Sequence, residues 1–354
     1  MTRSAPLLLD ETQLARVLIE MDLVSRKAFV GGSVRFTLAD RRNRNVKIAL
    51  EGTDGLFTKQ AKSYEALITL QRESAALDLL SLTEDDLSNH LPKKIAFNNG
   101  FGLLVTKLIA DGRSLHDVLL HSGRIQARHA RMAGAVLAGV HRRAIPANHD
   151  HGIRIPHTLE LNRPHYTLLN SLSPANLKLL EAIQNDHALS SGLDRLRANW
   201  QPCAFIHGDA KLDNMVVARD SVSLVDWELA TIGDPRWDVG TVFSSFLSNW
   251  VGSMPMAHGA SHELMTREAR LHIDKLQTSA RWFWLAYAST SGLDPSGPFR
   301  EEAMAYCGGR LMQTAYEYMQ HASRLTANAI YMMQMAANIL WNPSQGAEFL
   351  LGNP

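Results

Sequence analysis

Two short polar clusters in the second half of the sequence combine carboxylates with an amide beside apolar runs. Asp209 precedes Asn214 by five residues, and Asp226 follows in the second cluster. A carboxylate can accept a proton from an attacking hydroxyl, while an amide oxygen and a second carboxylate can hold magnesium against phosphates. The adjoining apolar runs, around Phe205 and Leu224, have strand length. We therefore expect the three side chains to project from strand ends into one cleft.

The spacing and flanking residues of these clusters resemble those of a known kinase-like family. Protein kinases carry His-Arg-Asp, four further residues and Asn in their catalytic loop, and the interval from Asp209 to Asn214 is the same. Gly208 stands where protein kinases have arginine, and Asp-Trp-Glu at 226–228 stands where they have Asp-Phe-Gly. With the segment Gly233–Asp238, these departures make the chain similar to the aminoglycoside phosphotransferase and choline kinase family.

The resemblance implies an ATP- and magnesium-dependent transfer of phosphate to a hydroxyl acceptor, in a protein-kinase-like α+β fold with two lobes. It implies that Asp209 is the catalytic base and that Asn214 and Asp226 are the metal ligands. Lys211 stands where protein kinases keep a lysine that neutralises the transferring phosphate; a solvated surface lysine is the alternative. Asp234 and Asp238 are expected to brace the loop rather than to contact the substrate.

Kinase-like sites also hold the nucleotide phosphates with a strand lysine that is tethered by a helix glutamate. Lys59 ends a predicted strand, and Glu73 lies on the apolar stripe of the helix predicted to follow it. A glutamate on a buried face is costly without a partner, so we expect Lys59 and Glu73 to pair. Lys62 and Glu65 are the alternatives, and two ordinary surface charges are a further interpretation.

Other nucleotide contacts depend on the resemblance alone, because the sequence has no Walker motif and no Gly-x-Gly-x-x-Gly loop. Arg42, Asn43 and Arg44 occupy the predicted turn over the phosphates, where their donors can contact phosphate oxygens. A turn with solvated arginines is an equally open interpretation. A later apolar run resembles the hinge, in which the Lys107 C=O and the Ile109 N–H would bind the adenine edge.

Hydrophobic periodicity predicts a small lobe with a sheet and one main helix, followed by a large helical lobe. Strands are expected at 33–38, 46–50, 56–60 and 102–108, the main helix at 63–82, and later helices at 281–289, 301–322 and 325–341. Hairpin-like spacing of the first strands and the family resemblance favour an antiparallel sheet. We therefore expect a nucleotide-binding lobe at 1–106 and a catalytic and acceptor-binding lobe at 107–354.

The composition is that of an ordinary globular protein and narrows the function classes. Of 354 residues, 45% are hydrophobic and 20% are charged, and the formal net charge of +1 would recruit neither nucleic acid nor an anionic membrane. Cys203 and Cys307 lie far apart, which disfavours a disulfide framework or a cysteine zinc site and favours a cytoplasmic setting. No apolar run reaches the roughly 18 residues that span a bilayer. His149, His151 and His157 lack acidic or cysteine companions, so no metal site is expected there.

The acceptor is expected to bind the helical lobe. Charges over the last hundred residues nearly balance, which disfavours polycationic aminoglycosides. Five glutamates are offset by five arginines: Glu263, Glu268, Glu301, Glu302 and Glu317 against Arg267, Arg270, Arg281, Arg300 and Arg310. The stretch from Trp237 to Pro255 is similar to kinases of class V lanthipeptide and thioamide pathways, which phosphorylate Ser and Thr of a precursor peptide ahead of elimination by a partner lyase. This similarity implies a peptide acceptor. The alternatives are a small alcohol (an aminoglycoside, a sugar, choline or a homoserine-like metabolite) and a catalytically weak pseudokinase that serves as a binding module.

Two apolar clusters on predicted helices have more than one interpretation. Trp282, Trp284 and Tyr287 could form part of an aromatic cage for a quaternary ammonium group. Met332, Met333 and Met335 could form a pliable binding face. Because such side chains on helices most often pack in cores, core packing is the preferred interpretation for both.

Overall fold

The polypeptide folds into two units, each made of two sequence segments. The first unit comprises Met1–Gly112 and Ala218–Ala230, and the second comprises Arg113–Val217 and Thr231–Pro354. The computed structural model describes residues 6–39, 43–52, 54–82, 85–144, 152–166, 172–256 and 261–353. The two predicted lobes divide the chain once, at residue 107, whereas the first unit also takes in residues 218–230. Separate nucleotide-binding and acceptor-binding roles stay predictions.

A five-stranded antiparallel sheet lies at the centre of the first unit. Its strands are β1 (Val34–Leu38), β2 (Arg44–Leu50), β3 (Leu56–Gln60), β4 (Lys94–Asn98) and β5 (Leu103–Lys107), in the order β1-β2-β3-β5-β4. Helix α3 (Tyr64–Leu80) begins where the Ser63 side chain accepts a hydrogen bond from the Ala66 N–H. The unit also contains the short helices α2 (Arg26–Val30) and η1 (Asp86–His90). The sequence predicts α3 and four of the strands, but not β4.

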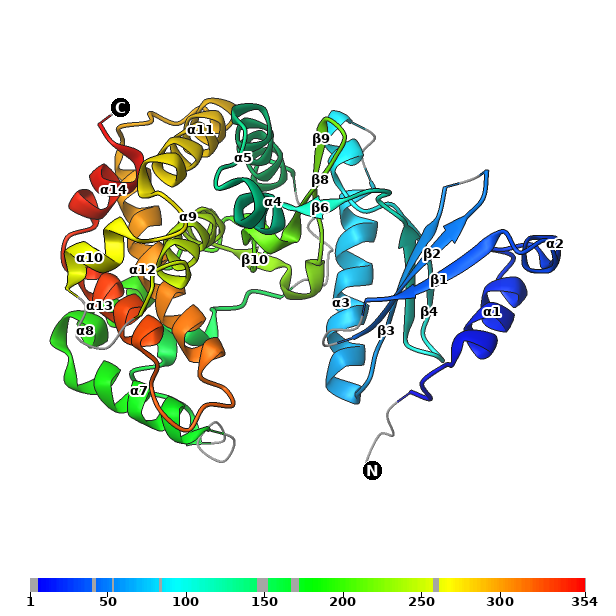
Figure 1. Cartoon of the computed structure of the whole chain (residues 1–354), viewed down its shortest axis with the longest axis horizontal. Coiled ribbons are helices and arrows are strands. Elements are labelled where there is room, and N and C mark those ends of the chain that lie inside the picture. Colours follow the sequence, from blue (N-terminus) through cyan, green and yellow to red (C-terminus); the bar gives the residue numbers. More distant parts are fainter. Residues whose placement is uncertain are drawn as a thin grey trace. The chain divides into compact units, whose positions relative to one another are not determined.

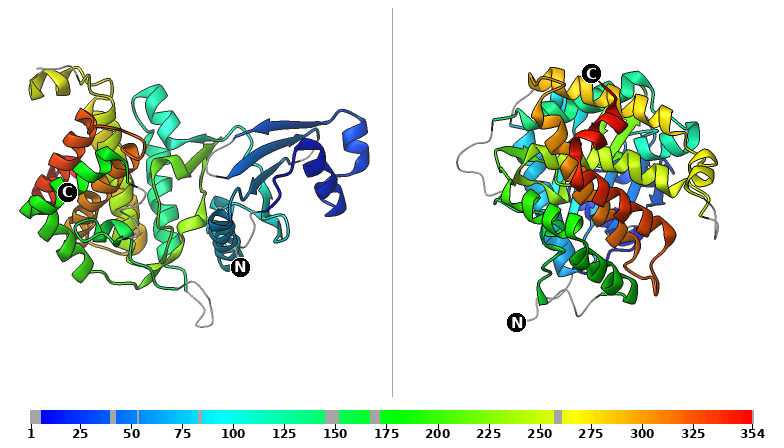
Figure 2. Two further views of the ribbon diagram at one scale, coloured as in Figure 1. Left: turned by 90° about the horizontal axis from the view of Figure 1, so that it is seen from below. Right: turned by 90° about the vertical axis from the view of Figure 1, so that its left-hand side faces the viewer.

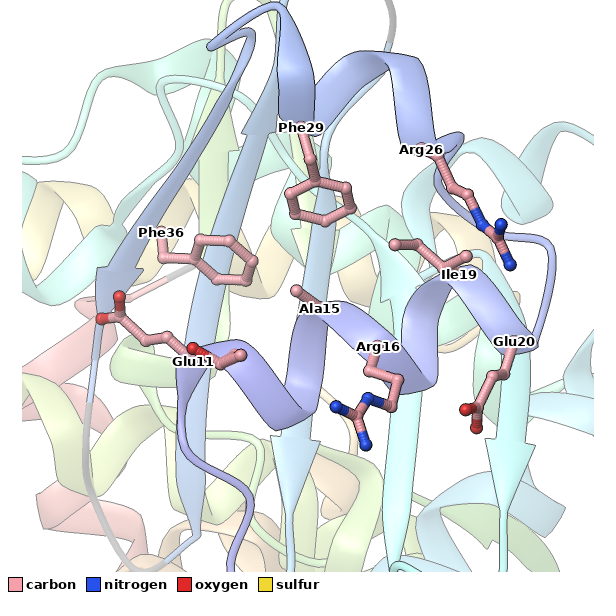
Figure 3. Close-up of a pocket in the computed structure, with 9 residues that line it drawn as sticks. Glu11, Ala15, Arg16, Ile19, Glu20, Arg26, Phe29 and Phe36 are labelled. Carbon is pink, nitrogen blue, oxygen red and sulfur yellow. The ribbon is translucent and has the colours of Figure 1, made fainter.

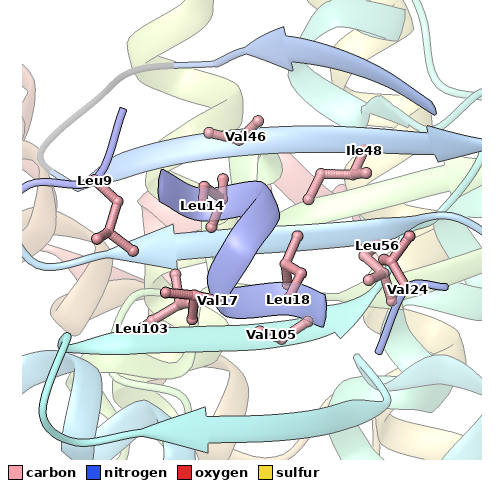
Figure 4. Packing of buried hydrophobic residues seen from close by; sticks show 10 residues of the cluster. All are labelled: Leu9, Leu14, Val17, Leu18, Val24, Val46, Ile48, Leu56, Leu103 and Val105. Carbon is pink, nitrogen blue, oxygen red and sulfur yellow. The ribbon is translucent and has the colours of Figure 1, made fainter. Parts of the chain in front are cut away.

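Helix α1 (Glu11–Glu20) packs on one face of this sheet, as Figure 4 shows. The buried cluster there consists of Leu9, Leu14, Val17, Leu18, Val24, Val46, Ile48, Leu56, Leu103 and Val105. Successive strand residues face opposite sides of a sheet, so Leu56 of β3 faces α1 whereas Lys59 faces the other side. Helix α3 contacts β3, β4 and β5 (Figure 1). Lys59 is thereby directed toward α3.

The second segment of the first unit runs from β9 (Ser221–Leu224) into the short helix η4 (Trp227–Leu229). Helix η4 packs against α3. Trp227 is fully buried, and its indole Nε1 donates to the Leu224 carbonyl at 2.9 Å. Asp226 directly precedes this buried anchor, so it is held beside α3.

Among the described residues of both units, no helix is long and apolar enough to cross a membrane. Helices make up most of the described part of the second unit. They are α4 (Leu115–Ser122), α5 (Ala127–His141), α7 (Pro174–Asn185), α8 (His187–Ala198), α9 (Pro235–Gly252), α10 (His262–Arg267), α11 (Ile273–Ser291), α12 (Pro298–Tyr318), α13 (Ala327–Trp341) and α14 (Pro343–Leu351). The short helices of this unit are η2 (His157–Glu160) and η3 (Leu212–Asn214). Its strands form two pairs: β6 (Arg113–Ser114) pairs with β8 (Met215–Ala218), and β7 (Ala204–Ile206) pairs with β10 (Thr231–Gly233). Helix α12 packs against α9 and α13, and α5 packs against α11 (Figures 1 and 2). An antiparallel sheet followed by a mostly helical remainder confirms the predicted α+β class.

Two glycines allow these helices to approach backbone to backbone. A Cβ on Gly134 of α5 would lie 2.3 Å from the Phe283 carbonyl oxygen of α11. A Cβ on Gly240 of α9 would lie 2.7 Å from both the Ala303 carbonyl oxygen and the Cys307 nitrogen of α12. Both distances are far inside van der Waals contact, so a side chain at either position would push the helices apart.

Core packing, not a quaternary-ammonium cage, explains Trp284 and Tyr287. Both residues are 2% exposed, and their rings stack with centroids 6.1 Å apart. The Trp284 Nε1 donates to the Pro295 carbonyl at 3.0 Å. The cage interpretation is therefore wrong for these two residues. Met332 and Met333 are also buried, as core packing predicts, whereas Met335 is only partly buried.

Candidate active site

Lys59 pairs with two carboxylates of the first unit. Its Nζ lies 2.7 and 2.9 Å from Glu73 Oε1 and Oε2, and 2.6 Å from Asp226 Oδ1. Glu73 is only 2% exposed on α3. The expected pairing of Lys59 with Glu73 is therefore present, while Glu65, the alternative partner, lies exposed in the first turn of α3. Nucleotide binding by the pair stays a prediction.

For both Lys59 and Glu73, burial and the charge of the partner shift the pKa in opposite directions. Burial alone would lower the pKa of Lys59, but the carboxylates of Glu73 and Asp226 raise that pKa above its ordinary value. Burial raises the pKa of Glu73, and the Lys59 ammonium opposes that rise. Lys59 therefore stays protonated at neutral pH.

Asp226 adopts a left-handed backbone conformation, with a φ of 71°. Few residues other than glycine do so, and those that do cluster at functional sites. The Asp226 side chain is 38% exposed. Its carboxylate is therefore accessible to a ligand as well as to Lys59.

Buried polar atoms gather at the predicted phosphate-binding turn between β1 and β2. Among the described residues, Asn43 Oδ1, Arg44 Nε and Asn45 Oδ1 are buried side-chain atoms without a hydrogen bond. A buried polar group that lacks a partner is costly, and a polar ligand in this turn would relieve the cost. The Arg44 Nε–H is a donor that suits a phosphate oxygen. Arg42 lies outside the described residues.

The predicted adenine-binding residues lie at the end of β5 and just after it. Lys107 is the last residue of the strand, and its Nζ lies 2.7 Å from Asp54 Oδ2. The Ile109 carbonyl accepts a hydrogen bond from the Gly112 N–H at 3.3 Å. Recognition of adenine by the Lys107 C=O and the Ile109 N–H stays a prediction.

In the second unit, α9 holds the loop that follows β7. Asp238 Oδ2 accepts the His207 N–H at 2.6 Å, and its Oδ1 accepts the Gly208 N–H at 2.9 Å. Gly208 has a φ of 82°, a conformation that favours glycine. Asp238 is fully buried, and His141 Nε2 lies 3.1 Å from its Oδ2. Asp238 thus braces the loop that carries Asp209, as the sequence predicts, whereas Asp234 accepts the Gln201 N–H and pairs with Arg236.

Three side chains hold the Asp209 carboxylate. Its Oδ2 lies 2.8 Å from Lys211 Nζ and 3.2 Å from Asn214 Nδ2. Its Oδ1 accepts a hydrogen bond from Arg310 Nη2. Burial would lower the pKa of Lys211, but Asp209 raises it above its ordinary value. Lys211 is therefore an ion-pair partner of Asp209 rather than an unpaired surface lysine.

Arg310 is the residue of this group that the sequence does not reveal. Read from the sequence, it is one of several balancing charges, yet it is 2% exposed on α12 and pairs with Asp209. One signal points to it: Arg310 stands inside the largely apolar stretch Cys307–Met312, where a charge is costly unless it is paired. No signal in the sequence indicates that Asp209 is the partner of Arg310, because the two residues are 101 positions apart.

The described residues fit a magnesium ion that is bound mainly through nucleotide phosphates. No group of three or more His, Cys, Asp or Glu side chains among them could hold a metal, and magnesium often takes only one or two protein ligands beside phosphates and waters. Asn214 Nδ2 donates to Asp209, which directs the Asn214 amide oxygen away from that carboxylate. Coordination by Asn214 together with Asp226, a residue of the other unit, stays a prediction. His149 and His151 lie outside the described residues.

The hollow that Figure 3 shows involves a different part of the first unit. It has a volume of about 670 Å³ and is lined by residues of α1, α2 and β1, among them Arg16, Arg26, Phe29 and Phe36. The Phe29 and Phe36 rings stack with centroids 6.2 Å apart. None of the predicted site residues lines this hollow.

A curated relative links part of the chain to a small-molecule kinase. Methylthioribose kinase from Yersinia enterocolitica is 29% identical over 158 residues, which cover 41% of this chain and 39% of that protein. The match thus spans about two fifths of the relative's length.

Solved structures with a similar fold cover nearly the whole chain. A choline/ethanolamine kinase family protein from Mesorhizobium loti has a TM-score of 0.58 at 14% identity, over 95% of this chain and 97% of that chain. The streptomycin–ATP–APH(2")-IIa ternary complex has a TM-score of 0.53 at 13% identity, over 98% and 99% of the two chains. These similarities confirm the predicted kinase-like fold.

A family model gives the most extensive match in sequence. The model, described as the phosphotransferase enzyme family (APH), matches residues 33–272. The match includes Lys59, Glu73, Asp209, Asn214 and Asp226. Because it covers well over half of the residues, the chain belongs to the phosphotransferase enzyme family.

Proposed function

We propose that this phosphotransferase transfers the γ-phosphate of magnesium-bound ATP to a hydroxyl group of a small organic acceptor. The observation that carries the proposal is the surroundings of Asp209, whose carboxylate is held by Lys211 and Asn214 at the spacing of a kinase catalytic loop. Family membership supports the reaction class.

The nucleotide is bound by residues of the first unit. Lys59, fixed by Glu73 and kept positive by its carboxylate partners, holds the nucleotide phosphates. Arg44 and Asn43 add polar contacts from the turn between β1 and β2. The Asp226 carboxylate, now 2.6 Å from Lys59 Nζ, would be a ligand of the metal ion. Magnesium, when bound, neutralises charge on the β- and γ-phosphates.

The acceptor is activated by residues of the second unit. Asp209 orients the acceptor hydroxyl and takes its proton as transfer proceeds. Lys211, an ion-pair partner of Asp209, offsets charge on the transferring group. The Asn214 amide oxygen contributes to the metal site. Both groups of residues serve one transfer reaction.

The acceptor class follows from the charges around Asp209. Lys211 and Arg310 offset Asp209 and Glu317 in formal charge, and Arg310 is too deeply buried to move into solvent. A balanced site disfavours polycations and favours an acceptor with few charges. The relatives are named as kinases of small molecules, methylthioribose in one case and choline or ethanolamine in another. The peptide acceptor and its partner lyase gain no support from these relatives.

A panel of acceptors tests the proposal. Purified protein is incubated with Mg·ATP and, separately, methylthioribose, choline, homoserine, serine, kanamycin and a Ser- and Thr-rich peptide library, and products are examined by mass spectrometry. A mass gain of one phosphate on a small alcohol is expected. Modification of the peptides alone would restore the peptide hypothesis. Tight binding of Mg·ATP without transfer to any acceptor would instead indicate a pseudokinase.

A further inference from the structure

Arg310 is a buried cation on α12 in direct contact with Asp209. Its Nη2 donates to Asp209 Oδ1, and its Nη1 lies 3.5 Å from Glu317 Oε1. Among the described residues, Nη1 makes no hydrogen bond although it is buried. Such an arrangement is a poor source of stability, because a buried charge with incomplete hydrogen bonding costs free energy. A functional role explains its presence better than stability does.

Hydrogen bonds among Thr158, Gln313 and Glu317 hold Glu317 next to the guanidinium of Arg310. The Thr158 hydroxyl donates to Gln313 Oε1 at 2.6 Å, and Gln313 Nε2 donates to Glu317 Oε1 at 2.7 Å. Thr158 is fully buried and Gln313 is 7% exposed. Glu317, although 39% exposed, is therefore held near Nη1 while Asp209 accepts from Nη2, and the guanidinium cannot turn without losing one of these contacts.

We propose that Arg310 is the positioning residue for Asp209: it locks the rotation of the carboxylate so that the acceptor hydroxyl meets an oxygen in a fixed place. This inference rests on the proposed function. Lys211 and Asn214 both contact Oδ2, so they alone leave Oδ1 unrestrained. Lys211 is also 34% exposed on a flexible stem, whereas the planar Arg310 is enclosed and rigid. With donors on both oxygens, the carboxylate cannot turn about its Cβ–Cγ bond without breaking a contact.

The test compares Arg310→Met and Arg310→Lys with Arg300→Met, a matched control. Arg300 lies on the same helix and is 8% exposed, but its Nη2 donates to the Gly352 carbonyl and not to Asp209. Steady-state rates are measured with Mg·ATP and the most active compound among methylthioribose, choline, homoserine and serine. Arg310→Met is expected to lower kcat on the order of 10²-fold, the cost of a misplaced catalytic group. The KM for ATP should change by less than about threefold, because the lost interaction acts only in the transfer step.

Two further readouts separate positioning from folding. Arg310→Lys restores one donor to Asp209 and should recover part of the lost kcat, whereas Arg300→Met should keep kcat near the wild-type value even if its Tm falls. If Arg310→Met does not fold, Glu317→Gln is measured instead. This change keeps Arg310 but removes the negative charge of its second ion-pair partner. A severalfold fall in kcat at an unchanged KM for ATP is expected.

The outcomes distinguish this inference from the proposed function. A folded Arg310→Met variant with wild-type kcat, or an equal loss of kcat in Arg300→Met, would overturn the role of Arg310 while leaving phosphoryl transfer in place. Wild-type protein that transfers phosphate to no small alcohol of the acceptor panel, kanamycin included, would overturn the small-molecule kinase activity itself.

Discussion

Lys59 Nζ lies 2.6 Å from Asp226 Oδ1 while it also contacts both carboxylate oxygens of Glu73. One ammonium group is thus shared by a buried glutamate and a half-exposed aspartate. If Asp226 holds magnesium in the working enzyme, its contact with Lys59 is the one that must give way, since Glu73 is buried with Lys59 as its salt-bridge partner. Under the proposed function, the nucleotide phosphates and the metal would replace one of these contacts of Lys59.

Lys59→Ala and Glu73→Ala should be non-additive, because the two side chains act as one ion pair. A double-mutant cycle on kcat/KM should give a coupling energy of about 0.5–3 kcal/mol. The surface pair Lys178–Glu181, with an Nζ–Oε2 distance of 2.8 Å and both side chains more than half exposed, is the control and should show little or no coupling. Simple additivity for Lys59 and Glu73 would instead favour Lys62 or Glu65 as a member of the pair, or no pair at all.

Asp226→Asn should remove the magnesium dependence of ATP binding. Asparagine tolerates the left-handed conformation of this residue better than alanine does, so the change tests the charge rather than the backbone. Calorimetry with and without EDTA should give the same weak ATP affinity for the variant, but different affinities for the wild type. Intact Mg·ATP affinity in Asp226→Asn would move the metal site elsewhere.

Gly240→Ala should destabilise the second unit, because its Cβ would lie 2.7 Å from backbone atoms of Ala303 and Cys307 on α12. Overpacking of this kind typically costs about 1–3 kcal/mol in the free energy of unfolding. Gly252→Ala is the control on the same helix, since a Cβ there meets no atom within 4 Å. Urea unfolding of both variants measures the difference. Equal stability of the two would contradict the close packing of α9 against α12.

Local signals made much of the site predictable. Asp209 and Asn214 lie five residues apart, and a strand end followed by an apolar helix stripe identified Lys59 and Glu73. Helix α1 also carries a local signal, a capping box in which Asp10 and Gln13 bond each other's backbone N–H groups. That signal predicts a helix start, although it does not reveal that α1 covers one face of the sheet.

The features that could not be predicted from the sequence depend on contacts between residues far apart in the chain. The pairing of Arg310 with Asp209 depends on where α12 packs, and that packing depends on a glycine of α9, Gly240. The aromatic cluster around Trp284 and Tyr287 looks the same in sequence whether it binds a ligand or fills a core. The elements that pack around the two rings determine which of these roles the rings have, and here those elements bury both rings.

Transfer of the γ-phosphate by wild-type protein and by Asp209→Asn is the most direct measurement of the proposed chemistry. ATP labelled in its γ-phosphate is supplied with magnesium and the most active compound of the acceptor panel, and labelled product is counted over time. The asparagine keeps the size and one oxygen of Asp209 but is a far weaker base, so the rate should fall on the order of 10²–10⁴-fold. Calorimetry should give an ATP affinity within severalfold of the wild type, because the residues proposed to bind the nucleotide are unchanged. A folded Asp209→Asn protein that transfers phosphate at nearly the wild-type rate would contradict the assignment of Asp209 as the catalytic base.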